Sequence, residues 1–441
     1  MPRPLKQIKR EEKKQNPRVF LLLAGGSFSL MFVAGFLSFY FTPEALPFEY
    51  QSLENGRASI SFPLDVKEEK DKKNNVFVAH VATPEAVKAI YMTSCVAGTP
   101  SFREKLIRLA EETEINSIII DVKDYSGRLA FPPESESLSH AYPSTCAVAD
   151  LRGVVEDLHD RGIYVIARIT VFQDPHLAML RPDLAVLKES DRSVWKDNKG
   201  LSFTDPGARE VWDYTVRIAK ETHALGFDEL NFDYIRFPSD GPMKDIYFPK
   251  SQNRPKADVL EDFFKFLSEE LDYTDDSGHK PVLSADLFGM TTNAVSGFDL
   301  NIGQVWEKTL PYFDYISPMV YPSHYPSGFN GWKDPNKHPY EIVNFAISEA
   351  VKKTVATSTR VFTIGSTEIA STSPALYTKK AYDKNKVRPW LQDFDYGGNY
   401  DIAEVKAQIQ AVYDVGLSSW LLWSPSNVYT RGALLSSQDV N

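Results

Sequence analysis

The chain has 441 residues, of which 43% are hydrophobic and 12% aromatic, enough for one large domain or two ordinary ones. Its formal net charge of −10 is unevenly distributed. The first 41 residues hold seven Lys or Arg and two Glu, so the remaining 42 basic and 57 acidic residues give positions 42–441 a net charge of −15. Such an acidic body argues against nucleic-acid binding, which requires a basic surface.

The N-terminal region is typical of a membrane anchor. Residues 19–41 carry no charge, and as a helix they would extend about 34 Å, enough to cross a hydrocarbon core of about 30 Å. The basic residues 1–18 are expected to form a cytoplasmic tail. A cleaved signal peptide is the alternative, but the run is long for one and lacks a small-residue cleavage pattern. We therefore predict a single-pass cell-membrane protein whose N-terminus is cytoplasmic and whose body is extracytoplasmic.

Residues 42–85 are expected to form a stalk, because they include a solvated charged run at 67–75. From 86 to 435, strand-like and helical segments alternate, which predicts a parallel sheet closed into a (β/α)8 TIM barrel. An open doubly wound sheet is the alternative, but no glycine-rich phosphate loop follows the first strand. The expected strands are 87–93, 115–123, 163–172, 227–237, 282–288, 315–321, either 360–368 or 387–394, and 419–423; the expected helices are 102–113, 151–161, 208–225, 259–271, 341–356 and 402–415.

The cysteines and histidines give weaker signals. Cys95 and Cys146 are the only cysteines and fall near strand ends or loops on one barrel face, so a disulfide and two free thiols are equally compatible. The eight histidines are scattered, with none spaced i, i+4. No metalloprotease, nucleophile-elbow or Walker motif is present.

The segment 227–238 reads FDELNFDYIRFP and alternates apolar with polar residues at period 2. Leu230, Phe232 and Tyr234 form the apolar set, and Glu229, Asn231 and Asp233 form the polar set. Because helices flank this strand, its apolar side is expected to pack outward and its polar side to face the barrel interior. Asp233 would then lie at the C-terminal end of a barrel strand, where this fold places its chemistry.

The same alternation in other strands brings more polar side chains to this face. Charges in a barrel mouth are costly to desolvate unless they are paired or used. They could form a structural ion network that closes the barrel, but three carboxylates at strand ends favour acid–base chemistry. The inward set comprises Asp121 and Lys123 of the second strand, Arg168 of the third, Asp286 of the fifth and Tyr321 of the sixth, with His324 on the following loop.

Tryptophans add a second signal, because their flat apolar rings beside carboxylates suit the faces of sugars. Trp195, Trp332, Trp390 and Trp423 fall in or next to predicted loops or strand ends. Taken singly, Trp390 and Trp423 are explained more simply by packing. We include both among the candidate substrate-binding residues.

These motifs resemble the Putative glycosyl hydrolase domain family of bacterial and archaeal envelope proteins, long classed as a domain of unknown function. The resemblance covers residues 85–435 and runs through 118–124, 162–168, 226–241, 284–289, 314–325, 388–394 and 420–423. It implies a TIM barrel related to glycoside hydrolases. It also implies that 387–394 is the seventh strand and that 358–385 is an insertion. Many α-glycan hydrolases with this barrel place a nucleophilic Asp at the end of strand four, here Asp233, and a Glu acid at the end of strand five, where this chain has Asp286.

We therefore expect a glycoside hydrolase that cleaves a cell-envelope or extracellular polysaccharide. Asp233 would be the nucleophile or base and Asp286 the general acid, with Asp121 a further acid candidate; no cofactor or metal is needed. The candidate substrate-binding residues are Asp124, Lys123, Arg168, Arg236, Tyr321, His324, Trp390, Asp393 and Trp423. The alternatives are a non-catalytic glycan-binding barrel and, third, a deacylase with Asp and His324 around one metal.

Overall fold

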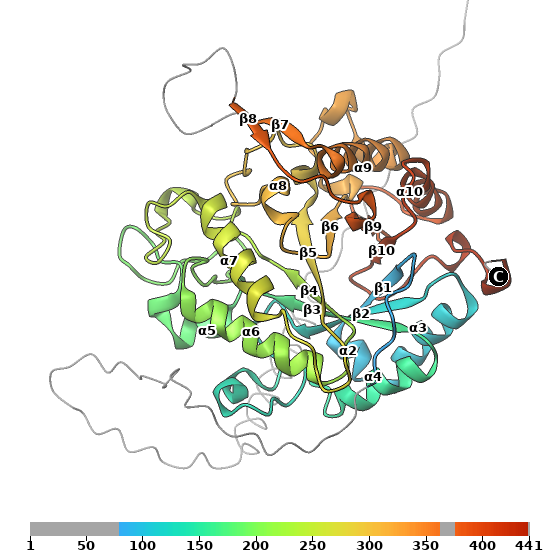
Figure 1. Ribbon diagram of the computed structural model, residues 1–441, viewed down its shortest axis with the longest axis horizontal. Coiled ribbons are helices and arrows are strands. Elements are labelled where there is room, and N and C mark those ends of the chain that lie inside the picture. Colours follow the sequence, from blue (N-terminus) through green and yellow to red (C-terminus); the bar gives the residue numbers. More distant parts are fainter. Residues whose placement is uncertain (1–78, 362–374, 440–441) are drawn as a thin grey trace, which may run out of the picture. The chain divides into compact units, whose positions relative to one another are not determined.

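The computed structural model describes residues 79–361 and 375–439 (Figure 1). The predicted cytoplasmic tail, membrane anchor and most of the stalk lie outside these residues and stay predictions. In the described part of the chain, none of the helices has the length and apolar character needed to span a membrane.

Eight parallel strands close into a barrel, which confirms the predicted TIM-barrel fold. Around the barrel, the strand order is β1-β10-β9-β6-β5-β4-β3-β2. Adjacent barrel strands are therefore consecutive in the sequence, apart from the pair β7–β8, which lies outside the barrel, and the closing pair β1–β10. The barrel strands are β1 (Lys88–Met92), β2 (Ser117–Lys123), β3 (Tyr164–Thr170), β4 (Glu229–Asp233), β5 (Val282–Phe288), β6 (Tyr315–Met319), β9 (Trp390–Gln392) and β10 (Trp420–Trp423).

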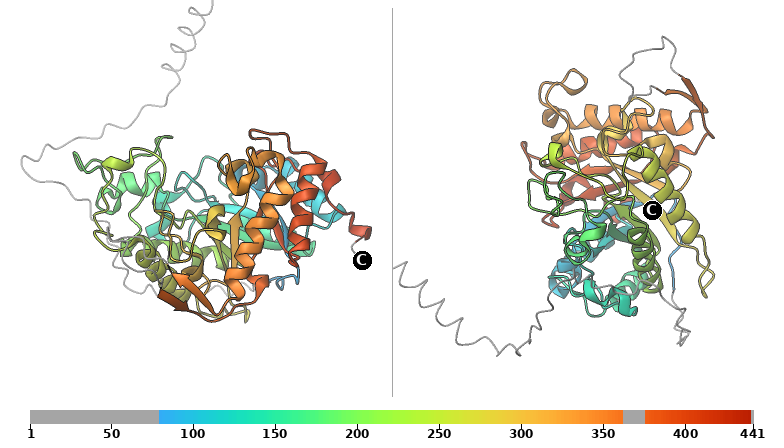
Figure 2. Two further views of the ribbon diagram at one scale, coloured as in Figure 1. Left: turned by 90° about the horizontal axis from the view of Figure 1, so that it is seen from above. Right: turned by 90° about the vertical axis from the view of Figure 1, so that its left-hand side faces the viewer.

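Helices surround the strands (Figure 2), and all six predicted helices are present with ends within three residues of expectation. The longer ones are α3 (Pro100–Glu112), α4 (Leu151–Asp160), α6 (Arg209–Ala224), α7 (Lys256–Glu270), α9 (Pro339–Val355) and α10 (Ile402–Asp414). Short helices α2 (Ser94–Ala97), α5 (Pro175–Leu180) and α8 (Trp306–Thr309) lie in the connections. Aspartates at 150 and 401 cap α4 and α10, accepting hydrogen bonds from the first-turn amides.

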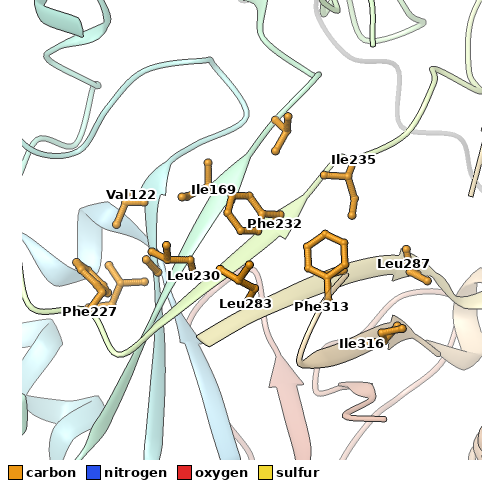
Figure 3. Close-up of a cluster of buried hydrophobic side chains, with 14 of the residues drawn as sticks. Val122, Ile169, Phe227, Leu230, Phe232, Ile235, Leu283, Leu287, Phe313 and Ile316 are labelled. Carbon is orange, nitrogen blue, oxygen red and sulfur yellow. The ribbon is translucent and has the colours of Figure 1, made fainter. Parts of the chain in front are cut away.

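The main hydrophobic core lies between the strands and the helices. Leu230 and Phe232 of β4 point into it beside Leu283 and Phe313, as Figure 3 shows. Their neighbours Glu229 and Asn231 are buried on the other side of the strand. The period-2 reading of this strand is therefore confirmed up to its last residue.

A smaller apolar cluster fills the barrel interior, so the barrel is a packed core rather than a pore. Its members come from six of the eight strands or their ends: Val87, Ala89, Tyr91, Ile119, Tyr164, Ile166, Tyr321, Trp390 and Leu421. A buried ion pair between Arg388 and Glu229, 2.7 Å long, lies in the same interior.

The seventh barrel strand is β9, within the predicted segment 387–394. The competing segment contributes β7 (Ser358–Val361), which pairs antiparallel with β8 (Ala375–Thr378) outside the barrel. Figure 1 places this hairpin at the periphery beside α9. The Lys379 ammonium holds it there by donating to the carbonyls of Thr354 and Ala356 at 2.9 and 2.6 Å.

The two cysteines are joined. Cys95 of α2 and Cys146 of the β2–α4 connection form a disulfide, with their Cα atoms 4.5 Å apart. The sequence left a disulfide and two free thiols open, and the structure contains the disulfide.

Candidate active site

The C-terminal ends of the strands surround a cavity of about 260 Å³. This is the end of a TIM barrel at which catalytic groups lie, because every strand–helix loop begins there. Two carboxylates, two guanidinium groups and several aromatic rings form its wall. The lining residues are Arg168, Asp233, Tyr234, Arg236, Asp286, Phe288, Met319, Tyr321, His324, Trp390 and Trp423.

Arg168 links the candidate carboxylates. Its Nη1 donates to Asp121 Oδ1 at 2.6 Å, its Nη2 pairs with Asp233, and its Nε lies 3.9 Å from Asp286 Oδ2. All four side chains are at most 8% exposed. One cation thus faces three acidic groups, which leaves the cluster with excess negative charge beside the cavity.

Asp286 is the carboxyl group whose surroundings most favour a proton. Burial, reinforced by the neighbouring charge of Asp233, raises the pKa of Asp286 well above its ordinary value. One of its oxygens accepts hydrogen bonds from Asn231 Nδ2 at 2.9 Å and from Trp390 Nε1 at 2.8 Å. The side chain is therefore fixed in orientation while it still lines the cavity.

Asp233 is oriented by the backbone that follows it. The Tyr234 amide donates to Asp233 Oδ1 at 2.5 Å, and Tyr234 itself has a φ of +52°. A left-handed conformation is uncommon for a bulky residue, costs on the order of 1–3 kcal/mol, and is concentrated at functional sites. The prediction that Tyr234 packs outward with Phe232 is wrong, because the strand ends at Asp233 and this turn carries Tyr234 to the cavity wall.

Asp121 lies behind Arg168 and does not line the cavity. The Tyr91 hydroxyl donates to its second oxygen, and the Tyr91 ring stacks on Trp423 at a centroid distance of 4.0 Å. Burial raises the pKa of Asp121 despite the opposing charge of Arg168. Tyr91 was not among the predicted site residues, although period 2 in the first strand places it inside with Ala89.

Lys123 lies outside the cavity, contrary to the predicted inward direction. A β-bulge between Asp121 and Lys123 shifts the register, so Lys123 pairs with the outward-facing Ile169. Its ammonium contacts Asp174 at 2.8 Å and lies over the Tyr214 ring of α6.

Two other candidate residues stabilise loops instead of lining the cavity. Asp124 accepts hydrogen bonds from the Ser126 amide and hydroxyl in the turn after β2. Asp393 accepts from the Thr430 amide at 2.9 Å and from its hydroxyl at 2.7 Å, so it fixes the loop after β10.

The rim of the cavity is formed by the remaining candidates. Arg236 lies over the Tyr234 ring and donates to Ser239 Oγ at 3.2 Å. The exposed His324 makes an edge contact with the buried Tyr321. Of the four tryptophans considered, Trp390 and Trp423 line the cavity, whereas Trp195 is fully buried in a separate cluster and Trp332 stacks on His338.

Among the described residues, His324 belongs to no group with metal-ligand spacing. Across residues 79–361 and 375–439, the group of histidine, cysteine or acidic residues with metal-ligand spacing is His80, His223 and His279. These three lie before β1, β4 and β5, at the other end of the barrel. The arrangement expected for a metal-dependent deacylase, with Asp and His324 around one ion, is therefore absent from the described residues.

The fold and this cavity define a TIM-barrel domain of the glycoside hydrolase type. The sequence matches the family described as "Putative glycosyl hydrolase domain" over residues 89–429, and the chain belongs to that family. No functionally curated protein matches the sequence.

One solved structure supports the fold. The glycoside hydrolase domain of PgaB (BpsB) from Bordetella bronchiseptica is 13% identical, with a TM-score of 0.51 over 79% of this chain and 99% of its own. A hypothetical protein from Ruminiclostridium thermocellum is 31% identical over 45% of this chain and 96% of its own, with a TM-score of 0.40. The glycoside hydrolase domain of PelA from Pseudomonas aeruginosa is 10% identical over 80% of this chain and 98% of its own, with a TM-score of 0.40.

Proposed function

We propose that this protein hydrolyses glycosidic bonds of a cell-envelope or extracellular polysaccharide in the cavity at the C-terminal face of the barrel. The observation that carries the proposal is the pairing of Asp233 and Asp286 on one cavity wall, with Arg168 between them. Glycoside hydrolysis requires two carboxyl groups in different protonation states. Family membership and the PgaB-like fold support the same reaction class.

In this mechanism Asp286 is the general acid. Its raised pKa keeps a proton available for the glycosidic oxygen as the bond to the anomeric carbon breaks. Asp233 acts on the other side of that carbon, either by direct attack or by removing a proton from water. A carboxyl separation of about 5–5.5 Å belongs to the first route and about 6.5–9.5 Å to the second.

Arg168 and the aromatic wall support the two carboxyl groups. The guanidinium stabilises the negative charge of Asp233 and, by holding Asp121 as well, fixes its own position. Trp423, which is partly exposed, offers a ring surface beside the carboxylates, where the C–H face of a sugar can pack. Trp390 is almost fully buried and instead orients Asp286 through its indole N–H. Tyr321, His324 and Arg236 then contact the glycan at the rim.

The proposed location is extracytoplasmic, with residues 19–41 as the membrane anchor. The Cys95–Cys146 disulfide supports this location, because disulfides persist in oxidising compartments. The acidic barrel is proposed to bind no nucleic acid.

A glycan-binding barrel without catalysis is the second candidate. One observation favours it: Asp233 is engaged at both oxygens, by Arg168 and by the Tyr234 amide. A purely structural ion pair would look the same. The second carboxylate on the cavity wall, Asp286, has no role in such a protein.

The deciding experiment compares the purified full-length chain with Asp233→Asn, measuring new reducing ends on a panel of envelope and α-linked polysaccharides. We expect hydrolysis by the wild type and a loss of about 10²–10⁴-fold in the variant. Asp191→Asn, the same change at an exposed loop residue, is the matched control. Equal activity of wild type and Asp233→Asn would remove Asp233 from the mechanism. Retained polysaccharide binding without hydrolysis by either protein would favour the glycan-binding barrel.

A further inference from the structure

Three histidines from distant parts of the sequence meet at the N-terminal end of the barrel. His80 precedes β1, His223 lies in the last turn of α6, and His279 lies in the connection before β5. Each offers a ring nitrogen, and these nitrogens lie within 4.8 Å of one another. This face is opposite the proposed active site, so the cluster has no part in the mechanism above.

The distances resemble those between ligands on one metal ion. His223 Nε2 lies 3.0 Å from His279 Nδ1, and His80 Nε2 lies 3.2 Å from Asp275 Oδ2. Ligands bound tetrahedrally to zinc at about 2.0–2.1 Å are about 3.3 Å from one another. Two pairs thus already have ligand spacing. The three rings are stacked, with centroids 3.9, 4.9 and 5.3 Å apart, so binding requires side-chain rotations that turn their ring nitrogens towards one point.

The outer contacts of these residues match those of metal-bound histidines, whose second nitrogen usually donates to an oxygen. His223 Nδ1 lies 2.9 Å from the Tyr273 hydroxyl, which can accept that proton and leave Nε2 with a free lone pair. His80 Nδ1 lies 3.4 Å from Asp228 Oδ1. The carboxylate of Asp275 is held through its other oxygen by the His279 amide at 2.9 Å, which leaves Oδ2 facing His80.

We propose that His80, His223 and His279 bind one divalent transition-metal ion of the zinc type, with Asp275 as the fourth ligand. Four protein ligands make a closed site, which is typical of a structural metal. Imidazole nitrogens suit zinc, whereas calcium and magnesium prefer oxygen ligands. The ion would fasten the segment that enters the barrel at His80 to the ends of α6 and of the α7–β5 connection.

The test is metal binding by the purified full-length chain after treatment with a chelator. Titration with Zn²⁺ should show one equivalent bound tightly, and Co²⁺ should give the strong visible absorption of a tetrahedral nitrogen–oxygen site. Zn²⁺ should raise the melting temperature by several degrees, because an ion that binds only the folded state stabilises it. Weak or absent zinc binding, or an octahedral cobalt spectrum, would overturn the proposal.

Variants locate the site. His279→Asn and His223→Asn should each weaken zinc binding at least tenfold and remove the cobalt absorption. His140→Asn is the matched control, because His140 pairs with His176 at 3.3 Å in a different part of the barrel and should leave binding unchanged. Unchanged binding in His279→Asn, or loss in His140→Asn only, would show that the ion is held elsewhere. Because the wild-type spectrum is decisive alone, a variant that fails to fold leaves the test intact.

Discussion

The two ends of strand β4 use the same residue type in opposite ways. Asp228, just before the strand, is completely buried, and both of its carboxylate oxygens accept hydrogen bonds. It accepts hydrogen bonds from the amides of Val81 and Val165, both at 2.8 Å, and from His159 Nε2 at 2.9 Å. Burial alone would raise the pKa of Asp228, but the hydrogen bonds from His159 and His80 outweigh it and lower that pKa.

At the other end, five residues later, the acidic groups outnumber their counter-charges. Asp233 shares Arg168 with Asp121, and burial together with Asp233 raises the pKa of Asp286 well above its ordinary value. Asp233 and Asp286 border a cavity, whereas Asp228 is completely buried. A buried charge destabilises a fold unless it is paired with partners of opposite charge or with hydrogen-bond donors. Acid–base chemistry requires instead that two neighbouring groups differ in protonation. Asp228 therefore contributes to stability at one end of β4, whereas the proposed function uses Asp233 and Asp286 for reactivity at the other.

Removing the shared cation should have the largest effect. We expect Arg168→Met to destabilise the protein by about 3–5 kcal/mol, because Asp121 and Asp233 would stay buried without a partner. Hydrolysis should fall below detection, since Asp233 would lose its orientation. Denaturant unfolding and reducing-end release measure the two effects.

Arg168→Lys serves as the companion variant. A single ammonium keeps the charge but cannot span two carboxylates, so stability should recover more than activity. Full activity in the lysine variant would mean that the site requires only the positive charge, and not the simultaneous contacts of Arg168 with Asp121 and Asp233.

A substitution at Asp228, at the other end of β4, should change the stability of the protein and not its activity. In Asp228→Asn, the new side-chain NH2 group would face backbone and histidine donors and lack an acceptor. We expect this unsatisfied buried donor to lower the free energy of unfolding by about 1–3 kcal/mol. Because the folded-state pKa of Asp228 is below its unfolded value, its contribution is present at neutral pH and is lost as pH falls through the folded-state pKa. The wild-type and variant stabilities should thus converge in acid.

Urea unfolding from pH 7 down to about pH 2 measures that convergence, because the folded-state pKa is below the ordinary value of 3.8. The rate of glycan hydrolysis at neutral pH should stay within about twofold of wild type. A large loss of activity in a folded Asp228→Asn protein would contradict the division between the two ends.

Most of the fold was predictable from the sequence, because each strand and helix has its own local pattern. Period-2 alternation in 229–233 and helical periodicity in 209–224 are properties of single segments, and the right-handed β/α connection then fixes the topology. The seventh strand was ambiguous, since the segments 360–368 and 387–394 both have strand-like sequences. The resemblance to a known family resolved that ambiguity correctly.

The site was predictable only where the strands stay regular. Asp121, Arg168, Asp233 and Asp286 meet as the alternation predicts. Lys123 does not join them, because a β-bulge turns it away and a single sequence does not reveal a bulge. The alternation also fails at Tyr234, where the backbone makes a left-handed turn that the sequence does not reveal. The histidine cluster could not be found by spacing, since its members come from three different loops or helix ends.

The smallest predicted effect concerns pH and tests the acid role of Asp286 most directly. Trp390 Nε1 donates to Asp286 Oδ1 at 2.8 Å, a hydrogen bond that favours the ionised form and so holds the pKa below what burial alone would give. In Trp390→Phe that pKa should rise further, by about one unit for a hydrogen bond to a charged group. A general acid works when protonated, so activity falls as pH rises through its pKa, and this basic limb of kcat should move to higher pH.

Trp195→Phe is the matched control, because the Trp195 indole donates instead to the Pro242 carbonyl at 3.3 Å, away from the carboxylates. Its pH profile should coincide with that of the wild type. A basic limb that stays in place or moves to lower pH in Trp390→Phe would mean that Asp286 is not the acid. The remaining acid candidate from the sequence would then be Asp121, whose raised pKa also has burial as its main cause, although it lies behind Arg168 and does not line the cavity.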